Sequence, residues 1–526
     1  MRTSILTTEG NAKVIEEPAQ LRLQLTDLID IHALPRISGG QGVDANQIRQ
    51  LEPKLIQFLE YFGGSFHRKD TRAHLGVYVR GQLSDLPEKS VEPIALDADV
   101  APRTLQEFLA QHRWPEDDLR ERLQKLVAAE HQGPHTIGVL DETSDPKKGD
   151  KTPGVQKQWC GRLGKTENCI VTVHLGFACG EFHCLLDGEL YLPESWAADR
   201  DRCREAGIPD TMVYRPKWTI ALELYDRVVS NGIRFDWLTF DEGYGSKPEL
   251  LRELTARKQR YVAEVPRSFT GWLDRPRVVS RRYHKNRRGR GRKTPRLASG
   301  SRPARRVDEL LQDPQLRDQP WQRFRVKDGQ KGPMVWECKR VLLTVKGADG
   351  LPGETRHLLV ARDVLSPGEL KFFVSNAPPG ISIDTLLLVA FSRWRVERCF
   401  EDQKSEIGLD QYEGRRYLGL KRHLILSCVS YLFLSRVRQE WAGKKSRADG
   451  LPAPDSGSRP GTGLGIVLTP IKGEAAGQSS QEDHLGRAAE RRGSQEPLQT
   501  HSAKAGRSWH QAVQPETMSV GHDLAL

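Results

Sequence analysis

The feature that most restricts the fold of this chain is a series of short apolar runs that begins at residue 135. Five runs share the β-branched and aromatic residues typical of strands, and they are 135–141, 168–178, 181–192, 235–241 and 259–266. The first three form a meander, and segments with a helical pattern at 218–230 and 248–258 separate the others. This order predicts an α/β fold built on a mixed sheet.

Two of these predicted strands end in an aspartate. Asp141 is the last residue of the first run, and Asp241 is the last residue of the fourth. In α/β sheets, ligands bind at the carboxyl ends of the strands, so both side chains lie where a site is expected. A single aspartate at a strand end is commonly only a turn residue. A third acid further along the chain makes a functional role for this pair more specific.

Residues 384–412 predict one long amphipathic helix that ends near Gly408. Arg393, Glu397 and Lys404 lie within it, and at ~100° of turn per residue they project from one stripe. Such a stripe occurs on any solvated helix that carries charge pairs four residues apart. An acid between two cations can equally hold a metal ion and a phosphate together, and the residues of this stretch leave both interpretations open.

Asp141, Asp241 and Glu397 together supply three carboxylates, which we interpret as the catalytic and metal-binding residues. Three carboxylates can hold two hard divalent cations about 3.5–4 Å apart. Oxygen ligands favour Mg²⁺, with Mn²⁺ as a substitute, over zinc. Such a pair of ions activates a water or a 3′-hydroxyl for in-line attack on a phosphodiester.

The charge of the chain agrees with a polyanionic partner. The net charge is +11 over 526 residues, which favours nucleic acid over a membrane surface. No apolar run reaches the ~20 residues that cross a bilayer, no secretory signal is apparent, and the longest run, 424–434, is expected to be a buried helix. The eight cysteines favour free thiols in a reducing cytoplasm over metal ligation by Cys179, His183 and Cys184.

The chain divides into three predicted parts. Residues 1–130 are predicted to be helical and to bind DNA, although the helix pair joined by residues 112–117 fits a plain helical hairpin as well as a helix-turn-helix. Residues 131–441 form the predicted catalytic domain, which a β-rich insertion interrupts at about 267–380. The tail, 442–526, is poor in apolar residues and is expected to be disordered.

The predicted insertion carries a cationic arm at 280–306. Like charges at this density repel one another unless an anion neutralises them, so the arm is interpreted as a DNA-phosphate contact rather than a solvated loop. Its predicted DNA-binding residues are Arg287, Arg288, Arg290, Arg292 and Lys293.

Four motifs carry a resemblance to a known family, and in chain order they are VLDETSDPKKGDKTPGVQKQWCGRLGKTENC, LYLPESWAADRDRCREAGIPD, TFDEGYGS and SRWRVERCFEDQKSEIGLDQYEGR. Over residues 45–437 the chain resembles the bacterial insertion-sequence transposases of the DDE class, which have an RNase H-like catalytic domain. It is most similar to the hairpin-forming group known by its YREK signature, in the seven-hundred-and-one branch of the insertion-sequence-four superfamily. The resemblance implies that Asp141, Asp241 and Glu397 are the catalytic triad.

The same resemblance matches Arg393 and Lys404 to the R and K of the signature, which contact DNA phosphate near the transposon end. The tyrosine of the signature falls on Ala390 here, and residues 442–526 also depart from the family pattern. Members of the family commonly act as dimers on terminal inverted repeats.

These inferences predict an Mg²⁺-dependent transposase that cleaves and transfers DNA strands at terminal inverted repeats. The expected partners are the transposon-end inverted repeats, target DNA and a second copy of the chain in the synaptic complex. The expected location is the bacterial cytoplasm, at the nucleoid when the protein is bound to DNA. Two alternatives stay open, namely an RNase H-like nuclease without strand transfer and a decayed, non-catalytic DNA-binding remnant.

Overall fold

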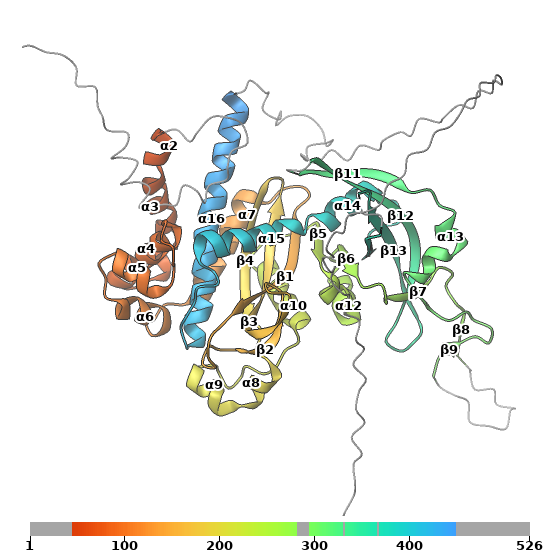
Figure 1. Ribbon diagram of the computed structural model, residues 1–526, viewed down its shortest axis with the longest axis horizontal. Helices are drawn as coiled ribbons and strands as arrows, with labels where there is room; N and C mark the ends of the chain where they lie inside the picture. Colours follow the sequence, from red (N-terminus) through yellow and green to blue (C-terminus); the bar gives the residue numbers. More distant parts are fainter. Residues whose placement is uncertain (1–44, 281–293, 330–331, 366–367, 449–526) are drawn as a thin grey trace, which may run out of the picture. The chain divides into compact units, whose positions relative to one another are not determined.

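A computed structural model describes residues 45–280, 294–329, 332–365 and 368–448. Twelve strands form one mixed sheet (Figure 1). In order along the sheet they are β10 (Arg305–Arg306), β7 (Thr270–Trp272), β12 (Gly332–Lys346), β13 (Pro352–Asp363), β14 (Leu370–Ser375), β6 (Tyr261–Val265), β5 (Trp237–Phe240), β1 (Ile137–Pro146), β3 (Lys165–Cys179) and β2 (Gln156–Cys160), with β11 (Gln322–Gly329) on β12 and β4 (Phe182–Leu190) on β3. A separate pair consists of β8 (Val278–Val279) and β9 (Arg296–Leu297).

All five predicted runs are strands of this sheet, which confirms the mixed α/β prediction. The sheet changes from antiparallel to parallel pairing at strand β1, which pairs antiparallel with β3 on one side and parallel with β5 on the other. Strand β5 continues the parallel part by pairing with β6. The parallel pairs of β1 and β5 end at Leu140 and Phe240, so the next residue of each strand path is an aspartate at the same edge of the sheet.

The predicted end of the first strand at Asp141 is wrong, because β1 continues to Pro146. Its edge toward β3 stays paired beyond Asp141, as far as Pro146 opposite Cys169. Asp141 is therefore the point at which β1 leaves its parallel partner while keeping its antiparallel one.

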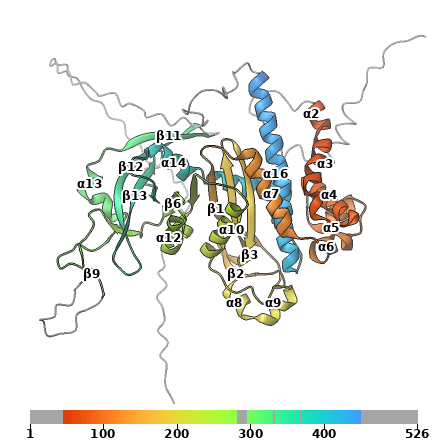
Figure 2. The ribbon, with the colours of Figure 1, turned by 180° about the vertical axis from the view of Figure 1, so that it is seen from behind.

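Strands of the predicted insertion extend the central sheet. Strand β14 pairs antiparallel with β6, and β13, β12 and β7 follow in turn. In both views β12, β13 and the short α13 (Pro314–Arg317) lie beyond β6 and α12 (Pro248–Ala256), on the side away from β1 (Figures 1 and 2). The insertion is thus joined to the catalytic strands through backbone hydrogen bonds.

The first helices pack with the last helix of the described chain. The N-terminal helices are α2 (Ala45–Arg49), α3 (Leu51–Phe62), α4 (Lys69–Leu83), α5 (Val91–Asp97), α6 (Pro102–Ala110) and α7 (Glu116–His131), with a short 3₁₀ turn at Gly63–Ser65. In Figure 1, helix α16 (Tyr417–Ala448) lies between helices α2 to α6 and strand β4, and it contacts α4, α6, α7 and β4. Figure 2 shows the same helix between α3 and α7. The Tyr78 hydroxyl lies 2.9 Å from His423 Nδ1, and Gln82 donates to Ser427 at 2.9 Å, so α4 is hydrogen-bonded to α16.

Helix α16 confirms the prediction of a buried helix at 424–434, where the apolar side chains are almost fully enclosed. Helix α16 runs to Ala448 and so includes the first residues of the tail that was predicted at 442–526. Alanine, lysine and arginine, which dominate residues 442–448, are good helix formers. The remainder of the predicted tail, 449–526, lies outside the described residues. No helix within the described ranges is long and apolar enough to cross a membrane.

The remaining helices lie around the sheet, and they are α8 (Glu194–Ala198), α9 (Arg200–Ala206), α10 (Lys217–Ser230), α11 (Glu242–Gly245), α12 (Pro248–Ala256), a 3₁₀ turn at Glu309–Gln312, α14 (Ile383–Phe391), α15 (Trp394–Asp402) and the π-helical η4 (Gln403–Ile407). The prediction of one continuous helix over 384–412 is wrong. The Ser392 hydroxyl donates to the Leu388 carbonyl at 2.6 Å, and the backbone at this point makes three-residue turns that separate α14 from α15. The predicted end near Gly408 is correct, since this glycine has φ of +77°.

Helix α15 is fixed to α16 by a buried acid. Asp402 Oδ1 lies 2.7 Å from Arg398 Nε, and Asp402 Oδ2 lies 2.6 Å from Arg438 Nη1 and 3.1 Å from the Tyr431 hydroxyl. Because Asp402 is almost fully enclosed, these bonds set the position of α15 over the sheet.

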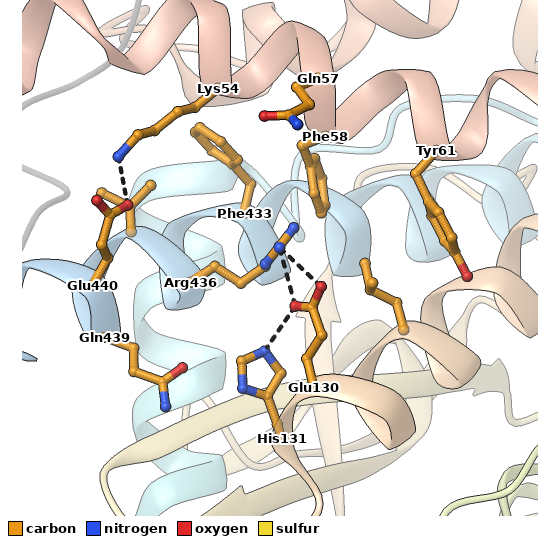
Figure 3. Close-up of a pocket in the computed structure, with 12 residues that line it drawn as sticks. Lys54, Gln57, Phe58, Tyr61, Glu130, His131, Phe433, Arg436, Gln439 and Glu440 are labelled. Atoms are coloured by element: carbon orange, nitrogen blue, oxygen red, sulfur yellow. Dashed lines mark hydrogen bonds and ion pairs between the residues drawn. The ribbon is translucent and has the colours of Figure 1, made fainter.

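The helical part also contains an open pocket of about 610 Å³ between α3, α7 and α16. Ion pairs Lys54–Glu440 and Glu130–Arg436 border it, and Phe58 lines it (Figure 3). None of the three predicted catalytic acids lines this pocket.

Candidate active site

Asp141 and Asp241 lie side by side at the point where the parallel pairing of β1 and β5 ends. Each directly follows the last parallel pair of β1 and β5. The Asp141 side chain is about one-tenth exposed, and its Oδ1 accepts the backbone N–H of Glu142 at 2.8 Å. Asp241 caps the short helix α11, because its side chain accepts the backbone N–H of Tyr244 at 3.2 Å. The two carboxylates are therefore held by local backbone geometry.

Glu397 approaches these aspartates from α15, which packs over β1, β3 and β4. Arg393 stands between the acids, with Nη1 3.3 Å from Asp141 Oδ2 and Nη2 2.7 Å from Glu397 Oε1. The Glu397 side chain is half exposed. One guanidinium thus joins a buried strand acid to a half-exposed helix acid.

The acids interact electrostatically. Burial raises the pKa of Asp141 to about 7, Arg393 opposes that rise, and the charges of Asp241 and Glu397 add to it. Burial disfavours the ionised form, and so does a neighbouring negative charge. Asp141 therefore interacts electrostatically with both of the other predicted acids, and its carboxyl group keeps a proton to a higher pH than an exposed aspartate does.

The donor set of this site fits a hard divalent cation, because it consists of carboxylate oxygens whose mutual repulsion a cation would relieve. Among the described residues, no three or more His, Cys, Asp and Glu side chains are gathered closely enough to hold a metal ion. The Arg393 guanidinium supplies the positive charge between Asp141 and Glu397. Ligation by all three acids would require this guanidinium to move and the carboxylates to come closer together.

Lys404 also contacts strand β1, at an acid four residues beyond Asp141. Its Nζ lies 3.3 Å from Asp145 Oδ1 and donates to the Ser144 carbonyl at 3.4 Å. Burial raises the pKa of Asp145, and the charges of Lys404 and Lys147 oppose that rise. Arg393 and Lys404 thus both face β1, at acids four residues apart, although α15 and η4 are not one regular helix.

Sequence reasoning did not identify Asp145 as the partner of Lys404, since it was only one of several acids near the predicted triad. The spacing of Asp141 and Asp145 on one strand face was the available signal. The predicted phosphate contacts of Arg393 and Lys404 stay predictions. The predicted DNA-binding residues of the cationic arm, Arg287, Arg288, Arg290, Arg292 and Lys293, lie outside the described residues.

Replacing Lys404 with methionine is expected to lower the free energy of unfolding by about 1–3 kcal/mol, because the substitution leaves the buried Asp145 carboxylate without its nearest cation. Adding Asp145→Asn should restore most of the loss, and denaturant melts of the single and double variants measure both effects. If the single variant instead melts like the parent and binds DNA ends weakly, and the double variant recovers nothing, Lys404 contacts phosphate.

The amino-acid sequence is similar to known proteins over part of its length. Residues 61–333 match the model of a family described as DDE superfamily endonuclease. A protein of Microchaete diplosiphon described as "Probable transposase for insertion sequence element IS701" is 32% identical over 222 residues, which cover 39% of this chain and 55% of that protein. The chain therefore spans about half the length of this curated relative.

One solved structure is also similar in part. The NurA nuclease from Sulfolobus solfataricus aligns with 60% of this chain and 86% of its own at 8% identity. Its TM-score of 0.23 is too low to support an argument about the fold or the chemistry.

Proposed function

Because the chain belongs to the DDE superfamily endonucleases, we propose that it is the transposase of an insertion sequence, which cleaves DNA strands at terminal inverted repeats and joins them to a target. The observation that carries this proposal is the placement of Asp141 and Asp241 just beyond the last parallel pair of β1 and β5, with Glu397 linked to Asp141 through Arg393. The similarity to the Microchaete protein supports transposition over simple hydrolysis.

The catalytic domain is proposed to be RNase H-like and to cover residues 131–441. The antiparallel strands β1, β3 and β4 followed by the parallel strands β5 and β6 support this assignment. The β-rich insertion at about 267–380 and an N-terminal DNA-binding domain at 1–130 complete the proposed organisation.

Endonucleases of this superfamily generally use divalent metal ions. We propose Mg²⁺, with Mn²⁺ as a substitute, held as a pair by Asp141, Asp241 and Glu397. When bound, the ions lower the pKa of the attacking water or 3′-hydroxyl and neutralise charge on the phosphate.

Asp141, Asp241 and Arg393 each have a role in this proposed chemistry. Asp141, with its pKa near 7, must release its proton to become a ligand, and the neighbouring Arg393 favours that release. Asp241 is held in place by the N-terminus of α11. Arg393, once it leaves the carboxylates, can donate two parallel N–H bonds to a phosphate oxygen pair near the scissile bond.

The proposed partners are the DNA of both transposon ends, the target DNA and a second copy of the chain. Arg393 and Lys404 are proposed to contact phosphate beside the carboxylates, and the arm residues at 287–293 are proposed to contact it elsewhere. These contacts would make the affinity for DNA fall as the salt concentration rises. A plot of the logarithm of the affinity against the logarithm of the salt concentration should steepen by about one unit for each phosphate contact.

Incubating the full-length protein with Mg²⁺ and a DNA that carries both flanks of its own coding region tests the proposal. We expect strand breaks at the two ends and, with added target DNA, joined products on a sequencing gel. Cleavage without joined products would support a nuclease instead. Binding without any cleavage, in Mg²⁺ or Mn²⁺, would contradict an active transposase.

A further inference from the structure

The hairpin of β2 and β3 presents an exposed tryptophan to solvent. Trp159 is 61% exposed, and Leu163 in the turn is 45% exposed. Among the described residues, Trp159 is the only tryptophan among the exposed large hydrophobic side chains. Single exposed apolar residues are ordinary, so the neighbours of Trp159 and its position relative to the carboxylates decide whether it is functional.

The face that carries Trp159 is basic and polar. Lys157 and Trp159 are both exposed and lie two residues apart, which places them on one face of β2. Across the ladder they face Asn168 and Thr166. The nearby acid, Glu167, is opposite Gln158 and therefore belongs to the other face, where it pairs with Lys165 at 3.1 Å. A ligand on the Trp159 face meets an aromatic ring, an ammonium group and neutral side chains.

The turn of this hairpin is fixed beside the catalytic strand. The backbone N–H of Arg162 donates to the Ser144 hydroxyl at 3.3 Å. The same Ser144 accepts Lys404 Nζ on its carbonyl oxygen. Ser144 is three residues beyond Asp141 on β1, a distance of about 10 Å along a strand.

Basic side chains lie between the carboxylate of Asp141 and the turn of the β2–β3 hairpin. Arg393 contacts Asp141, Lys404 contacts Asp145, and Arg162 forms an ion pair with Asp410 just beyond η4. These three cations follow the segment from α15 to the hairpin turn. A DNA strand that leaves the carboxylates along these cations would reach the hairpin turn, because the turn is bonded to Ser144, about 10 Å along β1 from Asp141.

We propose that the Trp159 face of the β2–β3 hairpin binds unpaired DNA next to the cleaved end, with a base stacked on Trp159 and a phosphate near Lys157. This inference rests on the proposed function. An aromatic ring offers every base the same stacking surface, so the contact needs no particular sequence. A base within a duplex is already stacked on both sides, and the tryptophan therefore favours single-stranded DNA over duplex. The charge of the face excludes a cationic partner and suits a polyanion.

The test measures binding of the full-length protein, in EDTA so that no strand is cut, to a fluorescein-labelled single strand of about 12 nucleotides, within the ~4–16 nucleotides of typical single-strand sites. The same strand annealed to its complement serves as the duplex probe. Trp159→Ala should weaken single-strand binding about 5-fold to 150-fold, as expected for one stacked base, and should change duplex binding less than about 2-fold.

Two further variants keep the result specific. Trp159→Phe should retain single-strand binding to within about 3-fold, because a phenyl ring still stacks. Tyr214→Ala, which removes an exposed aromatic between α9 and α10, should have no effect on either probe. Equal weakening of both probes by Trp159→Ala, or no weakening, would overturn the inference, and so would a change of oligomeric state as the only effect. Since the parent protein's cleavage is assayed separately, loss of this inference leaves the proposed function standing.

Discussion

Replacing Asp141 with asparagine is expected to abolish DNA strand cleavage while leaving DNA binding unchanged. Asparagine keeps the size of the side chain but supplies no negative charge, so the site loses a ligand without losing any basic surface. Loss of several kcal/mol of charge stabilisation corresponds to at least about a 10³-fold fall in rate. Gel assays of cleavage and anisotropy measurements of binding, made on the same preparation, separate the two properties.

The same variant should be more stable than the parent at neutral pH when no metal is present. The folded pKa of Asp141 is about 7, above the ~3.9 of an unfolded chain. The native state therefore holds a proton that the unfolded state releases, and stability declines as the pH rises from about 4 to about 7. The substituted amide cannot ionise, so the melting temperature of the variant should exceed that of the parent by more at pH 8 than at pH 5.

Asp150→Asn is the matched control, because this exposed aspartate lies in the loop that follows β1. It should change neither cleavage nor the pH dependence of melting. Cleavage retained by the Asp141 variant would remove Asp141 from the catalytic residues, and a pH-independent difference in melting would show that its carboxylate is not destabilised by burial.

Local patterns were sufficient to predict most elements of the central sheet and the region of the site. The five β runs and two helices between 135 and 266 appear with boundaries that differ by a few residues. The neighbouring positions of Asp141 and Asp241 follow from one parallel register. Alternation of apolar residues and the rule for ligand sites in α/β sheets contain that information.

Features that depend on distant partners could not be predicted in the same way. Strand β1 passes Asp141 because β3 continues to pair with it, which is a non-local hydrogen-bond pattern. The pairing of Lys404 with Asp145 required knowledge of which strand face η4 covers. In each case the deciding contact joins residues whose proximity no local period describes.

Gly245→Ala is expected to damage both stability and catalysis, although the residue contacts no substrate. A Cβ atom at this position would lie 1.9 Å from the backbone oxygen of Glu264 in β6, far inside van der Waals contact. Since this neighbour is backbone within a paired strand, it cannot rotate away, and α11 must move instead. Overpacking of this kind costs about 1–3 kcal/mol or more.

Movement of α11 necessarily moves Asp241, because the Asp241 side chain caps this helix through the N–H of Tyr244. A displacement of ~1 Å at a catalytic group costs about 10²-fold in rate. We therefore expect Gly245→Ala to lower cleavage about 100-fold in molecules that remain folded, as judged by activity per folded molecule well below the melting temperature. Gly380→Ala, where an added Cβ meets nothing within 4 Å, should match the parent in both measurements. If Gly245→Ala loses stability but keeps full activity per folded molecule, α11 can shift without Asp241, and the short helix does not position the second carboxylate.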